Sequence, residues 1–142
     1  MHHAIFFDIG DTLVRTSDTK QWQPGAKQAL TSLFAKGIQV GLLSNTRGLT
    51  RVQLAGLLPP DFPWAQFAPA LILLSSEVGV EKPKLGIFRQ AISKSGLSAA
   101  DCLYCSENLT ETLAAQQTGM HAARILPGEL AEPATLAAIG TA

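Results

Sequence analysis

Short apolar runs alternate along this chain with longer stretches whose apolar residues recur at helical spacing, and this alternation limits the possible folds more than any other feature. Runs this short and this apolar are typical of strands buried on both faces of a parallel sheet. The predicted strands are Ala4–Phe7, Ile38–Leu43, Ala70–Leu74, Cys102–Cys105 and Met120–Ile125. The predicted helices lie near residues 26–36, 50–57, 85–95, 110–118 and 135–139. Their order predicts a Rossmann-like three-layer α/β/α sandwich with a five-stranded, mainly parallel sheet.

Length and charge exclude several classes of protein. The 142 residues predict one domain over residues 1–142, because domains average about 150 residues. Hydrophobic residues make up 46% of the chain and charged residues 15%, which excludes an intrinsically disordered protein. The 11 basic and 11 acidic residues cancel, so we expect no binding to nucleic acid or membranes through bulk charge. No apolar run approaches the roughly 20 residues of a transmembrane helix, and we expect a soluble cytoplasmic protein.

Polar side chains follow the predicted strands at the positions where ligands bind in sheets of this kind. Ligands of open parallel sheets lie beyond the carboxyl ends of the strands. The residues at or just after these ends are Asp8, Ser44, Asn45, Lys82, Glu107 and Glu111. A carboxylate can attack phosphorus, paired carboxylates can hold Mg²⁺, and a hydroxyl with an ammonium can bind phosphoryl oxygens. The combination indicates phosphoryl transfer.

These segments resemble the four motifs of the haloacid dehalogenase superfamily, in order, over residues 4–125. The first motif, an apolar strand followed by Asp-x-Asp-x-Thr, is similar to Asp8–Leu13. The second, a strand ending in Ser or Thr, matches Ser44–Asn45, and the third, a Lys before a helix, matches Lys82–Pro83. The fourth, a strand ending in paired acids, matches Glu107 and Glu111. The resemblance implies a hydrolase, and within the superfamily a phosphatase.

The resemblance also implies a role for each matching residue. Asp8 would be the nucleophile and, with the backbone carbonyl of Gly10, a ligand of Mg²⁺. Glu107 and Glu111 would complete the metal site. The residues assigned to the phosphoryl group are Ser44, Asn45, Thr12 and Lys82, with Thr12 also fixing the turn after the strand. Lys82 would in addition stabilise the charged intermediate, and the substrate would be a small or macromolecular phosphate ester.

Two positions depart from the family pattern. The phosphatases of the family carry an Asp two residues after the nucleophile as general acid, whereas this chain has Gly10. Asp11 comes one residue later, and the role is not transferred to it. A positioned acid contributes about 10²–10⁴-fold to the rate, so the lack of this carboxyl is expected to lower turnover. Glu107 stands where Asp is commoner, which lengthens the reach to the metal by one methylene.

The connections after the first two motifs are short. Residues 8–24 and 45–82 are each too short for the cap domain that many members insert there, so the resemblance implies a capless member with an open site. An open site suits a large substrate. Alternatively, a second subunit of a homo-oligomer covers it. We predict a Mg²⁺-dependent phosphatase. The alternatives are a binding or regulatory protein that has lost efficient turnover and, third, a true dehalogenase.

Structural roles compete with the functional ones at several positions. Ser44–Asn45 is also a common turn pair, Lys82 lies in a charged stretch, and Glu107 with Glu111 could form only the acidic first turn of a helix. Cys102 and Cys105 have the spacing of a redox or zinc half-site, but no second pair completes one, so core packing is expected. His121 is expected to be a packed or surface histidine. The aromatic residues Trp22, Phe62, Trp64 and Phe67 are assigned mainly to packing, with a substrate-facing role for one of them as the alternative.

Overall fold

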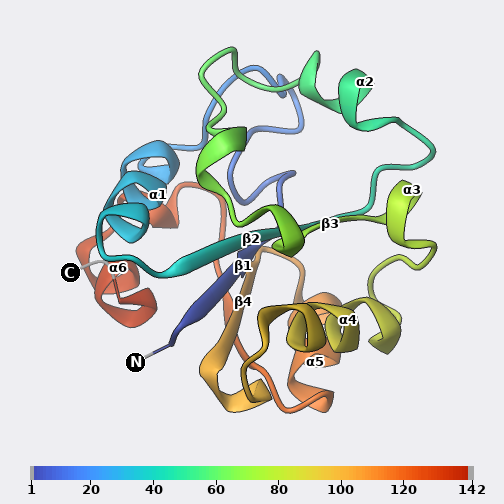
Figure 1. Ribbon diagram of the computed structural model, residues 1–142. Helices are drawn as coiled ribbons and strands as arrows, with labels where there is room; N and C mark the ends of the chain where they lie inside the picture. Colours follow the sequence, from blue (N-terminus) through green and yellow to red (C-terminus); the bar gives the residue numbers. More distant parts are fainter. Residues whose placement is uncertain (1, 141–142) are drawn as a thin grey trace.

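The computed structural model describes residues 2–140 and contains five parallel strands in one sheet. The strands are β1 (Ala4–Phe7), β2 (Gln39–Ser44), β3 (Ile72–Leu74), β4 (Cys102–Ser106) and β5 (His121–Arg124). Their order across the sheet is β3-β2-β1-β4-β5, so β1 lies at the centre (Figure 1). The predicted α/β sandwich with a five-stranded parallel sheet is confirmed.

Helices cover both faces of the sheet. The helix α1 (Ala26–Ala35) and the C-terminal α6 (Pro133–Ile139) lie on one face, and α4 (Leu85–Ser95) and α5 (Leu109–Gln117) lie on the other (Figure 1). Two shorter helices, α2 (Arg51–Ala55) and α3 (Ser75–Val78), follow β2 and β3. Single 3₁₀ turns span Trp64–Gln66, Pro69–Leu71, Ala99–Asp101 and Glu129–Ala131. Helix α3 and the 3₁₀ turns are not apparent in the sequence pattern, because one turn carries too few residues to show a period.

The apolar runs are continuous because both faces of the central strands are buried. In β1, Ile5 and Phe7 pack into the core on the α1 side, and Ala4 and Phe6 pack into the core on the α4 side. Side chains alternate across a strand, so a strand covered on both faces needs an apolar residue at every position. The edge strand β5 has no such need, and its outer residues His121 and Arg124 are exposed.

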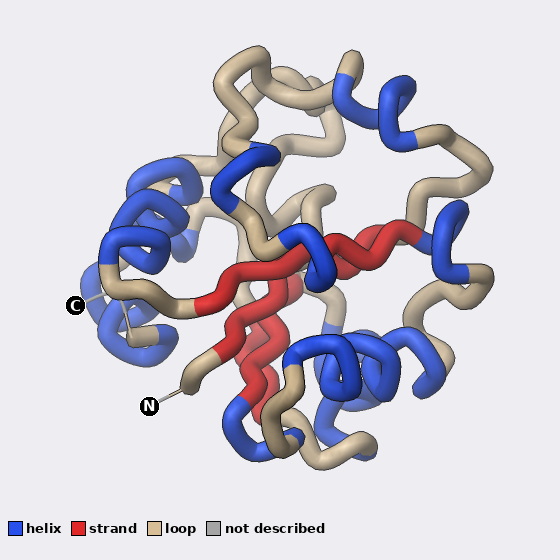
Figure 2. The backbone as a smooth tube through the Cα atoms, viewed as in Figure 1, coloured by secondary structure: helices blue, strands red, loops and turns tan. Residues whose placement is uncertain are grey.

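Two connections pack side by side above the sheet (Figures 1 and 2). The indole of Trp22, before α1, donates a hydrogen bond of 2.8 Å to Asp61 and stacks on Phe62 at 5.5 Å. Thr19 donates a hydrogen bond to the carbonyl of Leu57. Phe62 and Phe67 are buried in the core beneath, which confirms packing as the role of these aromatic residues. Within residues 2–140, neither connection builds more than short helices, and no helix is long and apolar enough to cross a membrane.

Candidate active site

The register of the sheet brings the ends of three strands together. Phe7 of β1 pairs with Leu42 of β2 on one side and with Cys105 of β4 on the other. The backbone N–H of Asp8 continues the ladder by donating to the carbonyl of Cys105 at 3.0 Å. Because parallel strands end at the same edge, Asp8, Ser44 and Ser106 lie there as neighbours. The prediction that the strand ends converge is confirmed.

Asp8 and Lys82 form a buried ion pair at this edge. The Lys82 ammonium donates to Oδ1 of Asp8 at 2.7 Å, and the Ile9 N–H donates to the same oxygen at 2.8 Å. Asp8 is 9% exposed and Lys82 is 4% exposed, so the chain itself removes most of the water from this pair. The two residues are 74 positions apart in sequence, so only the fold brings them into contact. Lys82 is thus not part of a solvated charge cluster.

A second carboxylate and a phenol complete the surroundings of the Lys82 ammonium. Oε1 of Glu111 lies 2.9 Å from Nζ, and the same ammonium donates to the Tyr104 hydroxyl at 3.0 Å. The Tyr104 hydroxyl in turn donates to Oε1 of Glu111 at 2.7 Å. In this structure Oε1 of Glu111 is held by Lys82 and Tyr104, and the expected metal-ligand role of Glu111 stays a prediction.

Tyr104 and Ser106 are site residues to which the sequence analysis gave no role. Tyr104 is fully buried in β4, inside a run assigned only to packing, yet its hydroxyl contacts both Lys82 and Glu111. Burial and the neighbouring carboxylates of Asp8 and Glu111 raise its pKa well above the usual value. The neutral phenol therefore stays a donor. The alternation along β4 could have revealed it, because Tyr104 and the strand-end Ser106 lie two positions apart and share a face.

The Asn45 side chain is hydrogen-bonded to the backbone of Lys82. Its amide oxygen accepts from the Lys82 N–H at 2.8 Å, and its amide nitrogen donates to the Lys82 carbonyl at 2.9 Å. This reciprocal pair ties the end of β2 to the loop before α4. The side-chain oxygen and nitrogen of Asn45 are thus engaged with the Lys82 backbone, and the expectation that Asn45 binds the phosphoryl group stays a prediction.

Thr12 likewise has a structural role. Its side chain is buried, and its hydroxyl oxygen accepts from the N–H of Glu107 at 3.1 Å, joining the loop after β1 to the end of β4. This contact agrees with the expected part of Thr12 in fixing the turn, and its assignment to phosphoryl binding stays a prediction. The Ser44 hydroxyl, at the buried end of β2, forms no hydrogen bond within residues 2–140.

Asp11 is engaged within its own loop. Its Oδ1 accepts from the Thr16 hydroxyl at 2.8 Å and from the Thr16 N–H at 3.2 Å. Its backbone is left-handed, with φ of 60°. Asp11 thus holds the loop after β1 closed, which agrees with the decision not to give it the role of general acid. Gly10 itself presents no side chain to a leaving group.

The residues that remain fit a divalent cation held partly by water. Burial, together with the negative charges of Asp8, Asp11 and Glu111, raises the pKa of Glu107, so this carboxylate lies within the field of three other acidic groups. A cation would relieve this repulsion, and Mg²⁺ accepts one or two carboxylates with several waters. Within residues 2–140, no three His, Cys, Asp or Glu side chains converge on one point. An ion bound here would therefore take most of its ligands from water and backbone oxygens, and the expected set of Asp8, Glu107 and the Gly10 carbonyl stays a prediction.

The buried charges of the site do not balance. Two carboxylates, Asp8 and Glu111, share the single ammonium of Lys82. Burial raises the pKa of Asp8, Lys82 opposes the shift, and Glu111 adds to it. Ser106 offsets part of the cost by donating to Oδ2 of Asp8 at 3.2 Å. The site thus holds excess negative charge in a poorly solvated place, which is favourable for binding a cation.

The two cysteines of β4 do not take part. Cys102 and Cys105 are buried free thiols, and burial raises the pKa of both. A thiol kept protonated is neither a nucleophile nor a metal ligand. The expectation of core packing is confirmed by their place in the two core clusters.

Comparison with known proteins identifies the fold. No family model and no curated protein matches the chain. An uncharacterized protein from Corynebacterium glutamicum is similar in structure, with a TM-score of 0.72 and 19% identity over 99% of this chain and 95% of that one. A HAD-superfamily hydrolase of subfamily IA from Geobacter sulfurreducens has a TM-score of 0.71 and 11% identity over 86% and 88%. CbbY from Rhodobacter sphaeroides, in complex with phosphate, has a TM-score of 0.66 and 13% identity over 86% and 85%. The chain has the fold of the haloacid dehalogenase-like hydrolases.

Proposed function

We propose that this protein is a Mg²⁺-dependent hydrolase of phosphate monoesters that works through an aspartyl-phosphate on Asp8. The observation that carries the proposal is the buried contact of Asp8 with Lys82 at 2.7 Å, at the strand edge where Ser44 also lies. A carboxylate beside a fixed ammonium and a hydroxyl offers a nucleophile together with donors for phosphoryl oxygens. The fold, which is that of known hydrolases, supports the same assignment.

The reaction would run in two steps. A carboxylate oxygen of Asp8 attacks phosphorus, the bond from phosphorus to the ester oxygen breaks, and the leaving alkoxide takes a proton from water. A second water then attacks the phosphorus of the aspartyl-phosphate and the bond to Asp8 breaks, which restores the carboxylate. One proton of this water stays on the inorganic phosphate, and the other neutralises the hydroxide left by the first step.

The protein groups supply charge and orientation in both steps. Lys82 offsets negative charge on the phosphoryl group, and the Ser44 hydroxyl donates to one of its oxygens. Asn45 holds the backbone of Lys82, and the Tyr104 hydroxyl holds its ammonium group. Bound Mg²⁺, held by Asp8, Glu107 and the Gly10 carbonyl, would neutralise further charge on the phosphoryl oxygens.

The test is a screen of phosphate monoesters with and without Mg²⁺, on the wild type and on Asp8→Asn. We expect turnover that needs Mg²⁺ and disappears in Asp8→Asn, with the fold retained. Activity of Asp8→Asn at the wild-type level would show that the nucleophile is misassigned.

A second function, a binding or regulatory protein that keeps the fold, is favoured by one observation. Gly10 offers no acid, and Asp11 is held by Thr16. An assay with an aryl phosphate and Mg²⁺ separates the two functions, because an aryl leaving group departs without protonation. Tight phosphate binding without any aryl phosphate hydrolysis would support the binding protein.

A further inference from the structure

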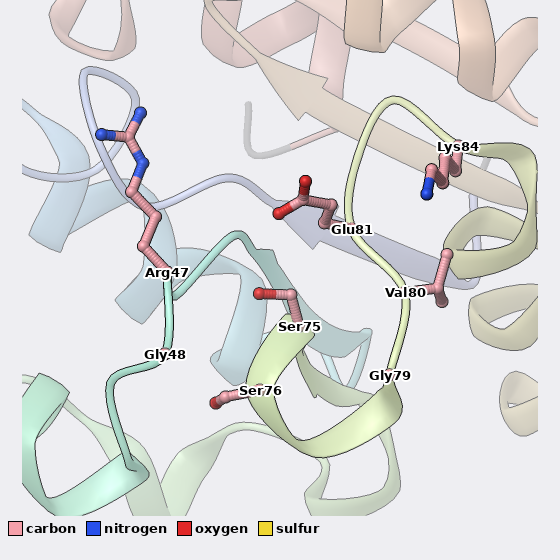
Figure 3. Close-up of a pocket in the computed structure, with 8 residues that line it drawn as sticks. All are labelled: Arg47, Gly48, Ser75, Ser76, Gly79, Val80, Glu81 and Lys84. Atoms are coloured by element: carbon pink, nitrogen blue, oxygen red, sulfur yellow. The ribbon is translucent and has the colours of Figure 1, made fainter.

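A polar pocket opens beside the proposed phosphoryl site. It has a volume of about 350 Å³ and lies between the loop after β2 and the loop before α4 (Figure 3). These are the loops that carry Ser44 and Lys82, and the Asn45–Lys82 hydrogen bonds tie them together. This pocket, called the distal pocket below, is therefore positioned to receive the part of an ester that extends away from phosphorus.

Three charged residues border the distal pocket, and the Arg47 side chain extends outward from its rim (Figure 3). Within residues 2–140, the guanidinium of Arg47, the ammonium of Lys84 and the carboxylate of Glu81 form no hydrogen bond or ion pair. Other charged groups nearby are paired: Arg51 binds Glu77 at 2.7 Å. The charges in the pocket sum to one positive charge. Ser75 and Glu81 point into the space between the two loops (Figure 3).

The loop that carries Arg47 is held rigidly. Arg47 and Gly48 are both left-handed, with φ of 49° and 82°, and the N–H of Leu49 donates to the carbonyl of Thr46 at 2.9 Å. These features define a tight turn of type I′. Thr46 is fastened to α3, because its N–H donates to the Ser75 hydroxyl at 2.8 Å and its own hydroxyl accepts from the Ser76 N–H at 3.0 Å. The Arg47 side chain thus leaves from a fixed backbone, although Gly or Asn would suit the turn better.

We infer that the distal pocket binds an anionic group, a carboxylate or a second phosphate, at the far end of the leaving group, with Arg47 as its main contact. The inference rests on the proposed function and names its substrate class. The carboxylate of Glu81 would repel an anion but can accept hydrogen bonds from hydroxyl groups. We therefore expect the part of the leaving group between phosphorus and the distal anionic group to carry hydroxyls. The volume lies near the lower end of the range of small-molecule sites, about 300–1,000 Å³, so this chain is short.

The experiment compares ligands that differ only at the far end, using the Asp8→Asn protein with Mg²⁺ so that nothing is hydrolysed. Calorimetry measures binding of 3-phosphoglycerate against glycerol 3-phosphate, and of 1,3-propanediol bisphosphate against propyl phosphate. The first pair tests a carboxylate and the second pair a phosphate. We expect at least one doubly anionic ligand to bind about tenfold tighter than its partner, the effect of one charge-assisted contact near the surface.

Arg47→Asn and Arg47→Gly, each added to Asp8→Asn, should abolish this preference. Both residues accept the left-handed backbone, so the turn survives in both variants. Arg89→Gln, on the exposed side of α4, removes a positive charge elsewhere and should keep the preference. Equal affinity within both pairs, or a preference that survives both Arg47 variants, overturns the inference while the proposed function stands. Failure of the Asp8→Asn protein to bind inorganic phosphate or any of the four ligands overturns both.

Discussion

At the residue scale, Asp8 is held in a charge environment that costs stability. Its raised pKa means that the folded protein binds a proton more readily than the unfolded chain, so stability falls as the pH rises through the folded pKa. Asp8→Asn removes this effect and leaves Lys82 paired with Glu111 at 2.9 Å. We expect the variant to be more stable than the wild type at neutral pH, with little gain below about pH 4, where aspartate is protonated in both states.

Urea unfolding of both proteins in EDTA, at several values of pH, measures this difference. The free energy of unfolding of Asp8→Asn minus that of the wild type should increase as the pH rises. A difference that shrinks over the same range would mean that Lys82 dominates and that Asp8 is stabilised by ionisation.

Gly10 is a second residue at which the proposed chemistry can be changed. Its backbone is not left-handed, so an Asp is not strained there, and the added Cβ would meet only the Thr16 methyl group at 3.2 Å. Gly10→Asp, with Thr16→Ser to remove that methyl while keeping the hydroxyl bound to Asp11, should supply the missing acid. We expect kcat/KM for alkyl phosphates to rise relative to aryl phosphates, by up to about 10²–10⁴-fold.

Thr16→Ser alone is the matched control for this pair of substitutions. The measurement is the alkyl-to-aryl ratio of kcat/KM in the double variant, the single variant and the wild type. If the ratio stays unchanged in a folded double variant that binds Mg²⁺, the proton already comes from another group.

At the scale of elements, the function depends on how the end of β2 is joined to the loop before α4. Within residues 2–140, the hydrogen bonds across this junction are the two that Asn45 forms with the Lys82 backbone. Asn45→Ala should lower the free energy of unfolding by about 1–3 kcal/mol, because it leaves partly buried backbone groups without partners. It should also lower kcat, since Lys82 loses its fixed backbone.

Asn108→Ala is a suitable control, because Asn108 also bonds to backbone, the N–H of Glu111, but caps α5 instead of joining two loops. Urea unfolding and steady-state kinetics on both variants separate the effects. We expect similar losses of stability, with the larger loss of kcat in Asn45→Ala. Wild-type kcat in a destabilised Asn45→Ala would show that Lys82 needs no such support.

At the scale of the whole molecule, a bound cation should stabilise the fold. Binding to the native state raises stability by about 2.7 kcal/mol at a ligand concentration of 100 times Kd. We expect Mg²⁺ to raise the Tm of the wild type, and to do so more strongly as the pH rises and Glu107, whose pKa is raised, becomes ionised. Glu107→Gln should lose most of this shift.

Glu111→Gln is the matched comparison, because Glu111 contacts Lys82 and Tyr104. It should keep the Mg²⁺-dependent shift even if its starting Tm is lower. Thermal unfolding with Mg²⁺ and with EDTA gives both values. An equal shift in Glu107→Gln and the wild type would place the cation elsewhere.

The expectation of a second subunit or a large substrate over the site stays a prediction. Desolvation strengthens the electrostatic contacts on which phosphoryl transfer depends, so a covered site should work faster than an open one. Light scattering under assay conditions tests it. A strict monomer with fast turnover of small phosphate esters would contradict it, and the observed burial of Asp8 and Lys82 by the chain itself supplies a physical reason for that outcome.

The fold and the edge of the sheet that carries the site could be predicted from the sequence. Strands such as Ala4–Phe7 and helices such as Leu85–Ser95 leave a local period, and parallel strands must end at one edge. The positions of Asp8 and Ser44 follow from that rule, whereas Lys82, in the loop before α4, was placed only by the resemblance of its motif.

Only the tertiary structure decided what each polar side chain at this edge does. Asn45 and Thr12 bind backbone groups of distant loops, and Glu111 lies beside Lys82. Tyr104 reaches into the site from a strand that looks purely apolar. The physical reason is that a hydrogen bond depends on groups meeting within about 3 Å. Residues that meet in this way here are up to 98 positions apart, so no local pattern records their contact.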